Sequence, residues 1–384
     1  MKTPTICHIC DYGSQYGGTF IDSLLFLSRY CRDKLQVATF CIFPDRAKNR
    51  SWLSNLDEEG IGYGFVPHKR NVAGPIRSLL AGREPLVLHS HFFTYDLTTI
   101  LLKYTTFKNS GIVWHYHNPC GGSVKQSIKD VLKIRLLLNL LGNYCIAVGD
   151  GVYKSVREAG LAPDKAILLH NGVNIGRFLD KCEVVPEARK SLGLSSEDMV
   201  FLLLGWSPRR KGVDIFFKAA EELGRKFTNC KFLVVGREET CEFVSQLMSK
   251  SSLGPDAFRV VDPVEDFSVL LRVTDVLVLA SRSEGLPYAV LEAMTAGKLV
   301  ISSALPAARE TYGRSNGAWL FPTEDWKMLA ELMEKGVLLQ ADERRSLGQT
   351  NGQYVVENHS LDQWSKRIGE LYEGITSRYQ RTLS

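Results

Sequence analysis

The stretch Ser281–Gly297 constrains the fold more than any other part of the sequence. It follows an apolar run, residues 275–280, whose length and branched side chains are typical of a buried parallel strand. A Ser/Glu/Gly turn comes next, and Pro287 fits the first position of a helix, where its missing N–H costs nothing. Gly297 fits the end of that helix, and residues 299–302 begin another strand. The order strand, turn, helix, strand predicts an open α/β sheet.

Two glutamates of this stretch are candidate ligand-binding residues. Glu284 falls at the carboxyl end of the predicted strand, and Glu292 lies about one and a half turns into the helix. In an open α/β sheet, ligands bind at this edge. Amides at a helix N-terminus suit an anion, and each carboxylate can accept hydrogen bonds from a pair of hydroxyls. The alternative is two solvated glutamates, but the glycine, the proline and the strand–turn–helix context favour a ligand site.

The same alternation of strands and helices recurs along the chain. It predicts two doubly wound parallel sheets, one in each half. A polar segment, residues 182–198, is the expected linker between them. The predicted strands are residues 5–10, 35–43, 61–66, 85–91, 111–117, 144–148, 166–170, 199–204, 231–236, 258–261, 275–280, 299–302 and 318–321. The predicted helices include residues 19–30, 48–59, 124–141, 213–226, 325–340, 342–357 and 360–378.

Two glycine-containing loops precede predicted helices and suit phosphate groups. Gly17 and Gly18 open the first helix, where they let the backbone approach a phosphate closely. Arg209, Arg210 and Lys211 lie in a glycine-bounded loop before the helix at 213–226. Lysine supplies a point charge and arginine a two-pronged donor, so three cations there suit a diphosphate. The alternative is a solvated basic turn.

The segment from Glu284 to Glu292, Glu-Gly-Leu-Pro-Tyr-Ala-Val-Leu-Glu, resembles the signature of the retaining nucleotide-sugar glycosyltransferases of family 4, which have the two-domain GT-B fold. The resemblance implies that Glu284 holds hydroxyls of the donor sugar and that Glu292 holds the ribose hydroxyls. Gly285, Leu286 and Pro287 would also face the donor. The family often has glycine where this chain has Pro287, and the proline removes one amide.

The resemblance extends to three further segments. The loop at 205–212 resembles the family's Gly-Arg-Leu…Lys-Gly loop with Lys211 in register, but Trp206 stands where the family has arginine. That arginine's role would fall to Arg209 or Arg210. Gly17 and Gly18 match a loop that faces the donor diphosphate and the acceptor. His117, before Asn118-Pro119, matches a family histidine, and the resemblance implies a catalytic role for Lys211, Glu284 and His117.

Two His-x-His pairs end predicted strands, His89/His91 and His115/His117. A spacing of two on a strand places both rings on one face. They can be read as a metal site, as core or surface histidines, or as neutral imidazoles that hydrogen-bond a sugar hydroxyl. A metal centre of this kind needs further ligands and a barrel, whereas the pattern here predicts two sheets. We therefore expect no metal site.

Residues 124–141 read as an amphipathic helix with four basic residues, Lys125, Lys129, Lys133 and Arg135. We expect an ordinary helix that covers the sheet and turns a solvated face outward. The alternative is attraction to an anionic membrane or to a lipid-linked acceptor.

The bulk composition limits the remaining classes of function. A net charge of +5 fits anionic ligands but does not favour nucleic acid. The chain begins without a signal-peptide pattern, and no uncharged apolar run approaches a membrane span. Nine scattered cysteines are typical of reduced cytosolic thiols. A cytoplasmic protein is expected, with peripheral contact at the inner membrane face as an option.

The resemblance and the pattern together predict a GT-B fold with two Rossmann-like doubly wound parallel-sheet domains facing a central cleft. The first domain would comprise residues 1–180 with a returning helix at 356–384, and the second residues 181–355. The expected activity is retaining transfer of a sugar from a nucleotide-diphosphate-sugar donor to a hydroxyl acceptor, without cofactor or metal. A nucleotide-sugar epimerase and a catalytically silent sugar-nucleotide-binding subunit are the alternatives.

Overall fold

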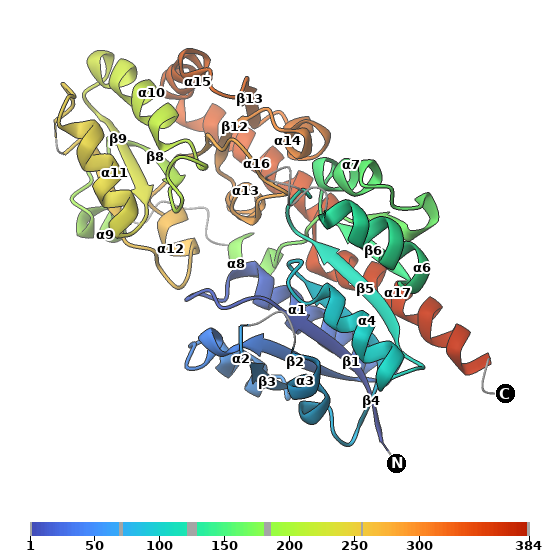
Figure 1. Ribbon diagram of the computed structural model, residues 1–384. Helices are drawn as coiled ribbons and strands as arrows, with labels where there is room; N and C mark the ends of the chain where they lie inside the picture. Colours follow the sequence, from blue (N-terminus) through green and yellow to red (C-terminus); the bar gives the residue numbers. More distant parts are fainter. Residues whose placement is uncertain (1, 69–71, 121–128, 180–185, 255, 382–384) are drawn as a thin grey trace. The chain divides into compact units, whose positions relative to one another are not determined.

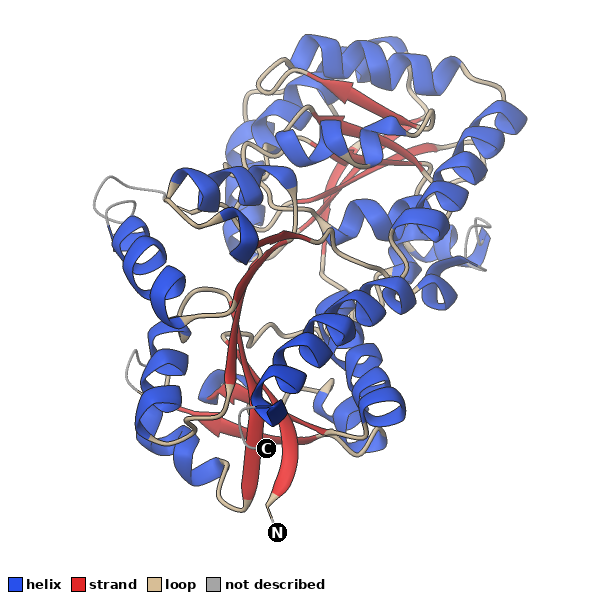
Figure 2. Ribbon diagram, turned by 90° about the vertical axis from the view of Figure 1, so that its right-hand side faces the viewer, coloured by secondary structure: helices blue, strands red, loops and turns tan. Residues whose placement is uncertain are grey.

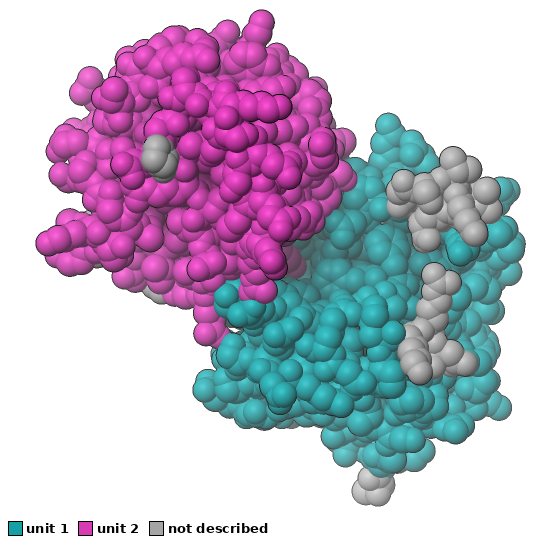
Figure 3. Space-filling view, turned by 60° about the vertical axis from the view of Figure 1, so that its left-hand side comes forward, with its two compact units in different colours: residues 1–172, 361–384 teal, residues 173–360 magenta. Residues whose placement is uncertain are grey.

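The computed structural model describes the chain except residues 1, 69–71, 121–128, 180–185, 255 and 382–384. The chain forms two compact units, Met1–Gly172 with Leu361–Ser384, and Val173–Ser360. We call these unit 1 and unit 2; Figure 3 shows them in different colours. The sequence-based division was 1–180 with 356–384, and 181–355.

Unit 1 is built on a parallel sheet (Figure 1). Its described strands form one seven-stranded sheet in the order β3-β2-β1-β4-β5-β6-β7. The strands are β1 (Thr3–Cys10), β2 (Ala38–Pro44), β3 (Gly62–Val66), β4 (Arg83–His91), β5 (Gly111–Tyr116), β6 (Tyr144–Ala147) and β7 (Ala166–Leu168). The helices are α1 (Gly18–Tyr30), η1 (Cys31–Leu35), η2 (Asp45–Ala47), α2 (Leu53–Glu58), α3 (Ala73–Leu79), α4 (Asp96–Thr105), η3 (Lys133–Leu138), α6 (Asn139–Leu141), α7 (Asp150–Glu158), η4 (Pro163–Lys165) and α17 (Leu361–Arg381).

Unit 2 repeats the architecture with a six-stranded parallel sheet in the order β10-β9-β8-β11-β12-β13, counted over its described strands. In both units helices lie on the faces of the sheet (Figure 2). The strands are β8 (Met199–Leu204), β9 (Cys230–Val235), β10 (Phe258–Val261), β11 (Val276–Leu279), β12 (Leu299–Ser303) and β13 (Ala318–Phe321). The helices are α8 (Ile175–Phe178), α9 (Pro186–Ser191), α10 (Val213–Lys226), α11 (Glu238–Met248), α12 (Ser268–Leu271), α13 (Tyr288–Thr295), α14 (Pro306–Glu310), η6 (Tyr312–Arg314), α15 (Trp326–Leu338) and α16 (Ala341–Asn358).

The order of strands reverses at one point in each sheet. In unit 1 the reversal lies between β1 and β4, and in unit 2 it lies between β8 and β11. Helices that follow two such neighbouring strands leave the sheet on opposite faces, which opens a crevice at the carboxyl ends of the strands. The loops after β8 and β11 therefore meet where a doubly wound sheet places its ligand.

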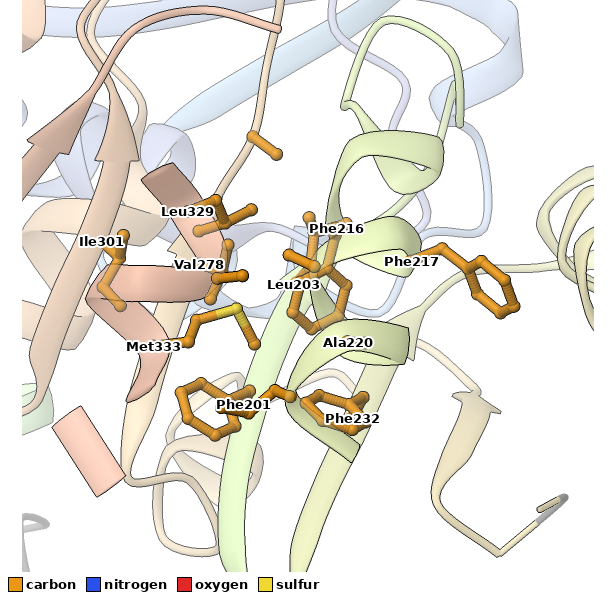
Figure 4. Close-up of a cluster of buried hydrophobic side chains, with 14 of the residues drawn as sticks. Phe201, Leu203, Phe216, Phe217, Ala220, Phe232, Val278, Ile301, Leu329 and Met333 are labelled. Carbon is orange, nitrogen blue, oxygen red and sulfur yellow. The ribbon is translucent and has the colours of Figure 1, made fainter. Parts of the chain in front are cut away.

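The core of unit 2 lies between the sheet and the helices α10 and α15 (Figure 4). Phe201 and Phe232 come from adjacent strands, and their rings stack with centroids 5.7 Å apart. Phe216 of α10 and Met333 of α15 are fully buried against them. The strands that carry this core are continuous apolar runs, as strands covered on both faces must be.

Helix α17 packs on the sheet of unit 1, although it follows unit 2 in the chain. Its buried residues are Trp364, Ile368, Tyr372 and Ile375, which lie on one stripe at helical spacing. They form one cluster with Ile6, Val87, Val113 and Ile146 of the strands and with Leu27 of α1. The opposite face of the sheet packs against α3 and α4 through a second cluster that includes Ile76 and Leu102.

The predicted two-sheet α/β fold is confirmed, and two predicted helices differ from the structure. The helix predicted at 48–59 is shorter, since α2 spans Leu53–Glu58 and a separate turn, η2, spans Asp45–Ala47. The helix predicted at 124–141 lies partly outside the described residues. Its described part contains a π-helical segment, Lys133–Leu138.

Candidate active site

The turn after β11 holds Glu284 at the carboxyl edge of the sheet. The hydroxyl of Ser281 donates a hydrogen bond to Glu284 Oε1 at 2.8 Å. The hydroxyl of Ser303, on β12, in turn donates to the main-chain oxygen of Ser281 at 2.7 Å. The Glu284 side chain is only 10% exposed. Two neighbouring strands thus fix this carboxylate in place.

The loop between β8 and α10 lies directly against this turn. Gly212, the residue before α10, has a φ of 69°, and a Cβ there would lie 2.0 Å from the main-chain oxygen of Ala280. Only glycine permits both the conformation and the approach. Lys211 is consequently placed beside Glu284, with Nζ 2.6 Å from Oε1. Arg210 Nη1 reaches the same oxygen at 3.3 Å.

The Lys211–Glu284 ion pair is buried, and the positive charge around it exceeds the negative charge. Lys211 is 8% exposed on its side chain, whereas Arg210 is 42% exposed. Burial lowers the pKa of Lys211 below its ordinary value, although the attraction of Glu284 offsets part of that effect. Two cations face one carboxylate, so positive charge is left over to attract an anionic ligand.

Arg282 joins the two loops, and the sequence analysis did not single it out. Its guanidinium bonds both carboxylate oxygens of Asp214, at the start of α10, at 2.9 Å each. It also bonds Glu324 at 2.7 Å and the main-chain oxygen of Arg209. The main-chain N–H of Arg282 donates to the main-chain oxygen of Arg210 at 2.8 Å.

The charges around Arg282 stabilise one another. The hydrogen bonds that Arg282 donates to Asp214 and Glu324 raise the pKa of Arg282. Burial tends to raise the pKa of Asp214, but the bonds from Arg282 outweigh it and the net pKa is lowered. Because Arg282 holds main-chain atoms of the cationic loop, it positions Arg210 and Lys211 against Glu284.

A cavity of about 440 Å³ lies beside the cationic loop. It is lined by Ser207, Pro208, Arg209, Arg210, Glu239, Glu242, Phe243 and Gln246. The Arg209 guanidinium lies 5.7 Å from the centre of the Phe243 ring. Arg209 and Arg210 therefore differ: Arg210 contacts the Lys211–Glu284 pair, and Arg209 stacks over Phe243. Trp206, half exposed, faces Lys211 with its ring centre 5.6 Å from Nζ.

The remaining predicted donor residues lie on the segment that follows Glu284. Gly285 is buried, and Leu286 is 3% exposed. Glu292 lies in the second turn of α13 and is 7% exposed. Pro287 was expected at the first helical position, but it is the residue before the helix, with a ψ of 120°. That prediction was wrong by one residue, because the fixed φ of proline suits either position.

In unit 1, Gly17 and Gly18 open α1 after β1. Gly18 has a φ of 53°, with open space where a Cβ would point. Gly17 lies against Trp52, and a Cβ there would come 2.8 Å from the Trp52 Cβ. The Tyr12 hydroxyl donates to the main-chain oxygen of Gly17 at 2.8 Å. Two aromatic side chains thus fix the shape of this loop.

His117 belongs to a layer of histidines at the carboxyl ends of β1, β4 and β5. Its Nε2 lies 3.3 Å from His91 Nδ1. Its ring stacks on Phe92 with centroids 4.3 Å apart. Burial lowers the pKa of His117 to about 3, so its imidazole is neutral. The layer also contains His8, which the sequence analysis did not connect with the His-x-His pairs.

The described part of this helix, residues 129–141, exposes three leucines and also two basic residues, Lys129 and Arg135, to solvent. Lys133 is turned inward, where its Nζ lies 2.8 Å from the buried carboxylate of Asp96 and over the rings of Trp114 and Tyr116. The prediction that Lys133 lies on a solvated basic face was wrong, because this buried carboxylate and aromatic cluster attract it. Lys125 lies outside the described residues. Of the helices that the structure describes, none is long and apolar enough to cross a membrane.

Known proteins resemble this chain in sequence and in fold. Residues 184–354 match the family model described as Glycosyl transferases group 1. The matched segment contains Arg209, Arg210, Lys211, Glu284 and Glu292. Solved structures agree on the fold: a glycosyltransferase from Rickettsia africae has a TM-score of 0.81 at 17% identity, covering 97% of this chain and 98% of its own. HepE of Anabaena, solved with UDP-glucose, has a TM-score of 0.80 at 13% identity over 96% and 99%.

The fold is thus that of the GT-B glycosyltransferases, and the resemblance to their group 1 family is confirmed for residues 184–354. Among curated proteins, the chain is 28% identical over 208 residues to N,N'-diacetylbacillosaminyl-diphospho-undecaprenol alpha-1,3-N-acetylgalactosaminyltransferase of Campylobacter jejuni, covering 53% of this chain and 52% of the relative. It is 27% identical over 237 residues to phosphatidyl-myo-inositol mannosyltransferase of Mycolicibacterium smegmatis, covering 60% and 57%. The chain spans about half the length of the curated relatives it matches.

Proposed function

We propose that the protein is a retaining glycosyltransferase, which moves a sugar from a nucleoside-diphosphate-sugar donor to a hydroxyl acceptor. The observation that carries the proposal is the buried ion pair of Lys211 and Glu284, joined by Arg210, at the switch point of unit 2. The match of this segment to the glycosyltransferase family model supports it. So does the shared fold with HepE, which was solved with UDP-glucose.

The arrangement accounts for how the leaving group is stabilised. When the bond to the sugar breaks, negative charge grows on the diphosphate. Lys211 and Arg210 then bind it more tightly in the transition state than in the ground state, and that difference accelerates the reaction. Because these cations neutralise the diphosphate, transfer needs no divalent metal. In this proposal Gly17 and Gly18 offer main-chain amides to the donor, and His117 hydrogen-bonds a sugar hydroxyl.

Glu284 acts as a ligand for the sugar rather than as a nucleophile. Within the described residues, Ser281, Arg210 and Lys211 all meet Oε1, so Oε2 keeps its capacity to accept from a hydroxyl. A carboxylate held by two cations is also a weak nucleophile. Retention would instead come from attack of the acceptor on the face that the diphosphate leaves, with the leaving phosphate as base. Glu292 would accept hydrogen bonds from the ribose.

The experiment begins with a thermal-shift screen against UDP-, GDP-, ADP- and dTDP-sugars, since a bound ligand raises apparent stability by mass action. Transfer is then measured with the donor that binds. Lys211→Ala should abolish transfer, and Glu292→Ala should weaken nucleotide binding at least tenfold. Lys226→Ala is the matched control, because that lysine is exposed on α10 and pairs with Glu334. Wild-type affinity and rate in both active-site variants would refute the proposal.

We further propose that the acceptor is lipid-linked and that unit 1 meets an anionic membrane through a patch of exposed apolar side chains. The helices α4 and 129–141 lie side by side, since Lys133 bonds Asp96 and the Tyr104 hydroxyl bonds the Leu141 main-chain oxygen at 3.5 Å. The patch consists of Leu97, Leu101, Tyr104, Leu132, Leu136 and Leu140, between 44% and 75% exposed. Exposed Lys129 and Arg135 on the same helix favour anionic headgroups.

The names of two relatives support this choice of acceptor, since they describe transfer to diphospho-undecaprenol and to phosphatidyl-myo-inositol. The test is sedimentation with vesicles of phosphatidylglycerol and phosphatidylcholine. Wild-type protein should bind the anionic vesicles, and Leu136→Glu with Leu140→Glu should not. Leu338→Glu, at a 64% exposed leucine of unit 2, should bind normally. Equal binding by the wild type, the double variant and Leu338→Glu would overturn the membrane assignment. So would a wild-type dimer that is lost in the double variant.

A further inference from the structure

Five histidines share one face of the unit 1 sheet because of its parallel register. His8 on β1 pairs with His89 on β4, and His91 on β4 pairs with His115 on β5. Side chains two apart on a strand point the same way, so His117 joins the same face. Neighbouring rings lie 4.3 Å apart for His89 and His91 and 4.5 Å apart for His115 and His117. Five of the chain's eight histidines are therefore gathered in one layer.

The layer is buried, and its polar atoms are incompletely paired. His8, His89, His91 and His115 are at most 1% exposed. Within the described residues, His8 Nε2, His89 Nε2 and both ring nitrogens of His115 have no hydrogen-bond partner. A buried polar atom left unpaired costs about 1–3 kcal/mol. The unpaired His89 Nε2, within this layer, points to a ligand that accepts its lone pair.

We propose that His8, His89 and His91 of unit 1 bind one divalent transition-metal ion of the Zn²⁺ class. One ligand nitrogen from each of the three lies within 4.8 Å of the others. His8 Nδ1 and His91 Nε2 are 3.1 Å apart. Two nitrogens at 2.0–2.1 Å from a tetrahedral zinc lie about 3.3 Å apart, so small ring rotations complete the site.

The surroundings of His89 support this choice of three ligands. His89 Nδ1 lies 2.6 Å from the hydroxyl of Tyr372, on α17. A hydrogen bond from the second ring nitrogen is the usual means by which a protein orients a metal-binding histidine, and here it directs Nε2 into the layer. His115 has no such partner among the described residues. The trio His91, His115 and His117 also lies within ligand distance, but it lacks this orienting contact.

The chemistry of the ligands selects the class of ion. Neutral imidazoles with no carboxylate among them suit zinc, nickel or copper, and they suit magnesium or calcium poorly. Histidine binds a metal ion through a neutral imidazole nitrogen. Three neutral ligands leave the ion its full charge. The fourth position would then go to a water that readily loses its proton.

The test measures metal directly and does not depend on sugar transfer. Full-length protein is stripped with a chelator, titrated with Zn²⁺ and Co²⁺, and followed by metal content, by melting temperature and by the visible absorption of tetrahedral Co²⁺. We expect one ion per chain and a raised melting temperature. His89→Phe should lose the ion, and His115→Phe, which removes an imidazole from the same layer, should retain it.

A second variant guards against a folding defect in His89→Phe. Tyr372→Phe keeps all three ligands and removes only the orienting hydroxyl, so it should weaken Zn²⁺ binding about 10–100-fold. Stripped wild-type protein that shows neither a Co²⁺ spectrum nor a Zn²⁺-induced shift would overturn the proposal. So would equal loss of metal from His89→Phe and His115→Phe. Nucleotide-induced stabilisation, measured in the same samples, reports separately on the proposed donor site.

Discussion

Among the described residues, one close carboxylate, that of Glu284, pairs with the nearly buried Lys211. Burial lowers its pKa, and the pair with Glu284 restores part of the loss. A diphosphate would add a second and stronger source of negative charge. The same arrangement that makes the lysine costly to bury in the free protein would therefore make it a tight ligand for the proposed donor.

The pH dependence of transfer should report this lysine. The proposed role needs the charged form, which is present below the pKa and lost as pH rises through it. Since the pKa of Lys211 is lowered from 10.5, kcat/KM should fall on the alkaline side before pH 10.5. Lys211→Arg stays charged throughout, so its weaker activity should lack that alkaline limb. If kcat/KM of Lys211→Arg still fell at alkaline pH as in the wild type, the fall would belong to another ionisable group.

Arg282 acts on the site through the residues that it holds. It bonds Asp214 at the start of α10 and main-chain oxygens of the cationic loop. We expect Arg282→Ala to lower nucleotide affinity about tenfold, or about 1.4 kcal/mol. Isothermal titration calorimetry measures this effect. Arg314→Ala, at a 63% exposed arginine that pairs with Glu310, should bind as wild type does.

The sequence predicts those site residues that directly follow a recognisable strand. It misses residues whose role depends on which strands are neighbours in the sheet. Lys211 and Glu284 follow predicted strands, so their place at one edge could be inferred. Arg282 looks like a solvated turn residue until β8 and β11 are known to be neighbours. The sequence likewise gives no sign that His8 belongs with the other histidines until the strand register pairs it with His89.

At the scale of elements, strands are better predicted than helices. Parallel strands covered on both faces are continuous apolar runs, which the sequence displays directly. Helix α17 is also clear, because Trp364, Ile368, Tyr372 and Ile375 recur at helical spacing. The inward turn of Lys133 could not be predicted, since it depends on Asp96 lying beside it.

The stability of unit 1 should depend strongly on α17. Ile368 is fully buried against the sheet, so Ile368→Ala should cost about 2–5 kcal/mol of unfolding free energy. Urea denaturation, monitored by circular dichroism, measures this loss. Glu370→Ala removes a half-exposed side chain of the same helix and should change the free energy by less than about 0.5 kcal/mol. Similar effects of both changes would contradict the packing described for α17.

At the scale of the whole molecule, the chain carries two doubly wound units with different contents at their switch points. Unit 2 gathers cations and a carboxylate between β8 and β11. Unit 1 gathers neutral imidazoles and a glycine loop around β1 and β4. The cations of unit 2 suit an anionic nucleotide, and the imidazoles of unit 1 suit a metal ion.

Nucleotide binding should therefore leave its signature in unit 2. Hydrogen exchange of the full chain, with and without the nucleotide found in the screen, should show added protection in the loop 205–212 and in residues 281–295. The amides of α17 serve as the internal reference. Protection gained by α17 and absent from the two loops would place the nucleotide elsewhere.

The return of α17 to unit 1 has a consequence for synthesis on the ribosome. All of unit 2 is translated between the strands of unit 1 and the helix that completes its core. Until α17 emerges, the sheet face that bears Ile6, Val87, Val113 and Ile146 is not covered by this helix. The nascent chain therefore exposes an apolar, aggregation-prone surface. We expect unit 2 to complete its folding before unit 1. Residues 1–172 would need a chaperone until α17 is translated.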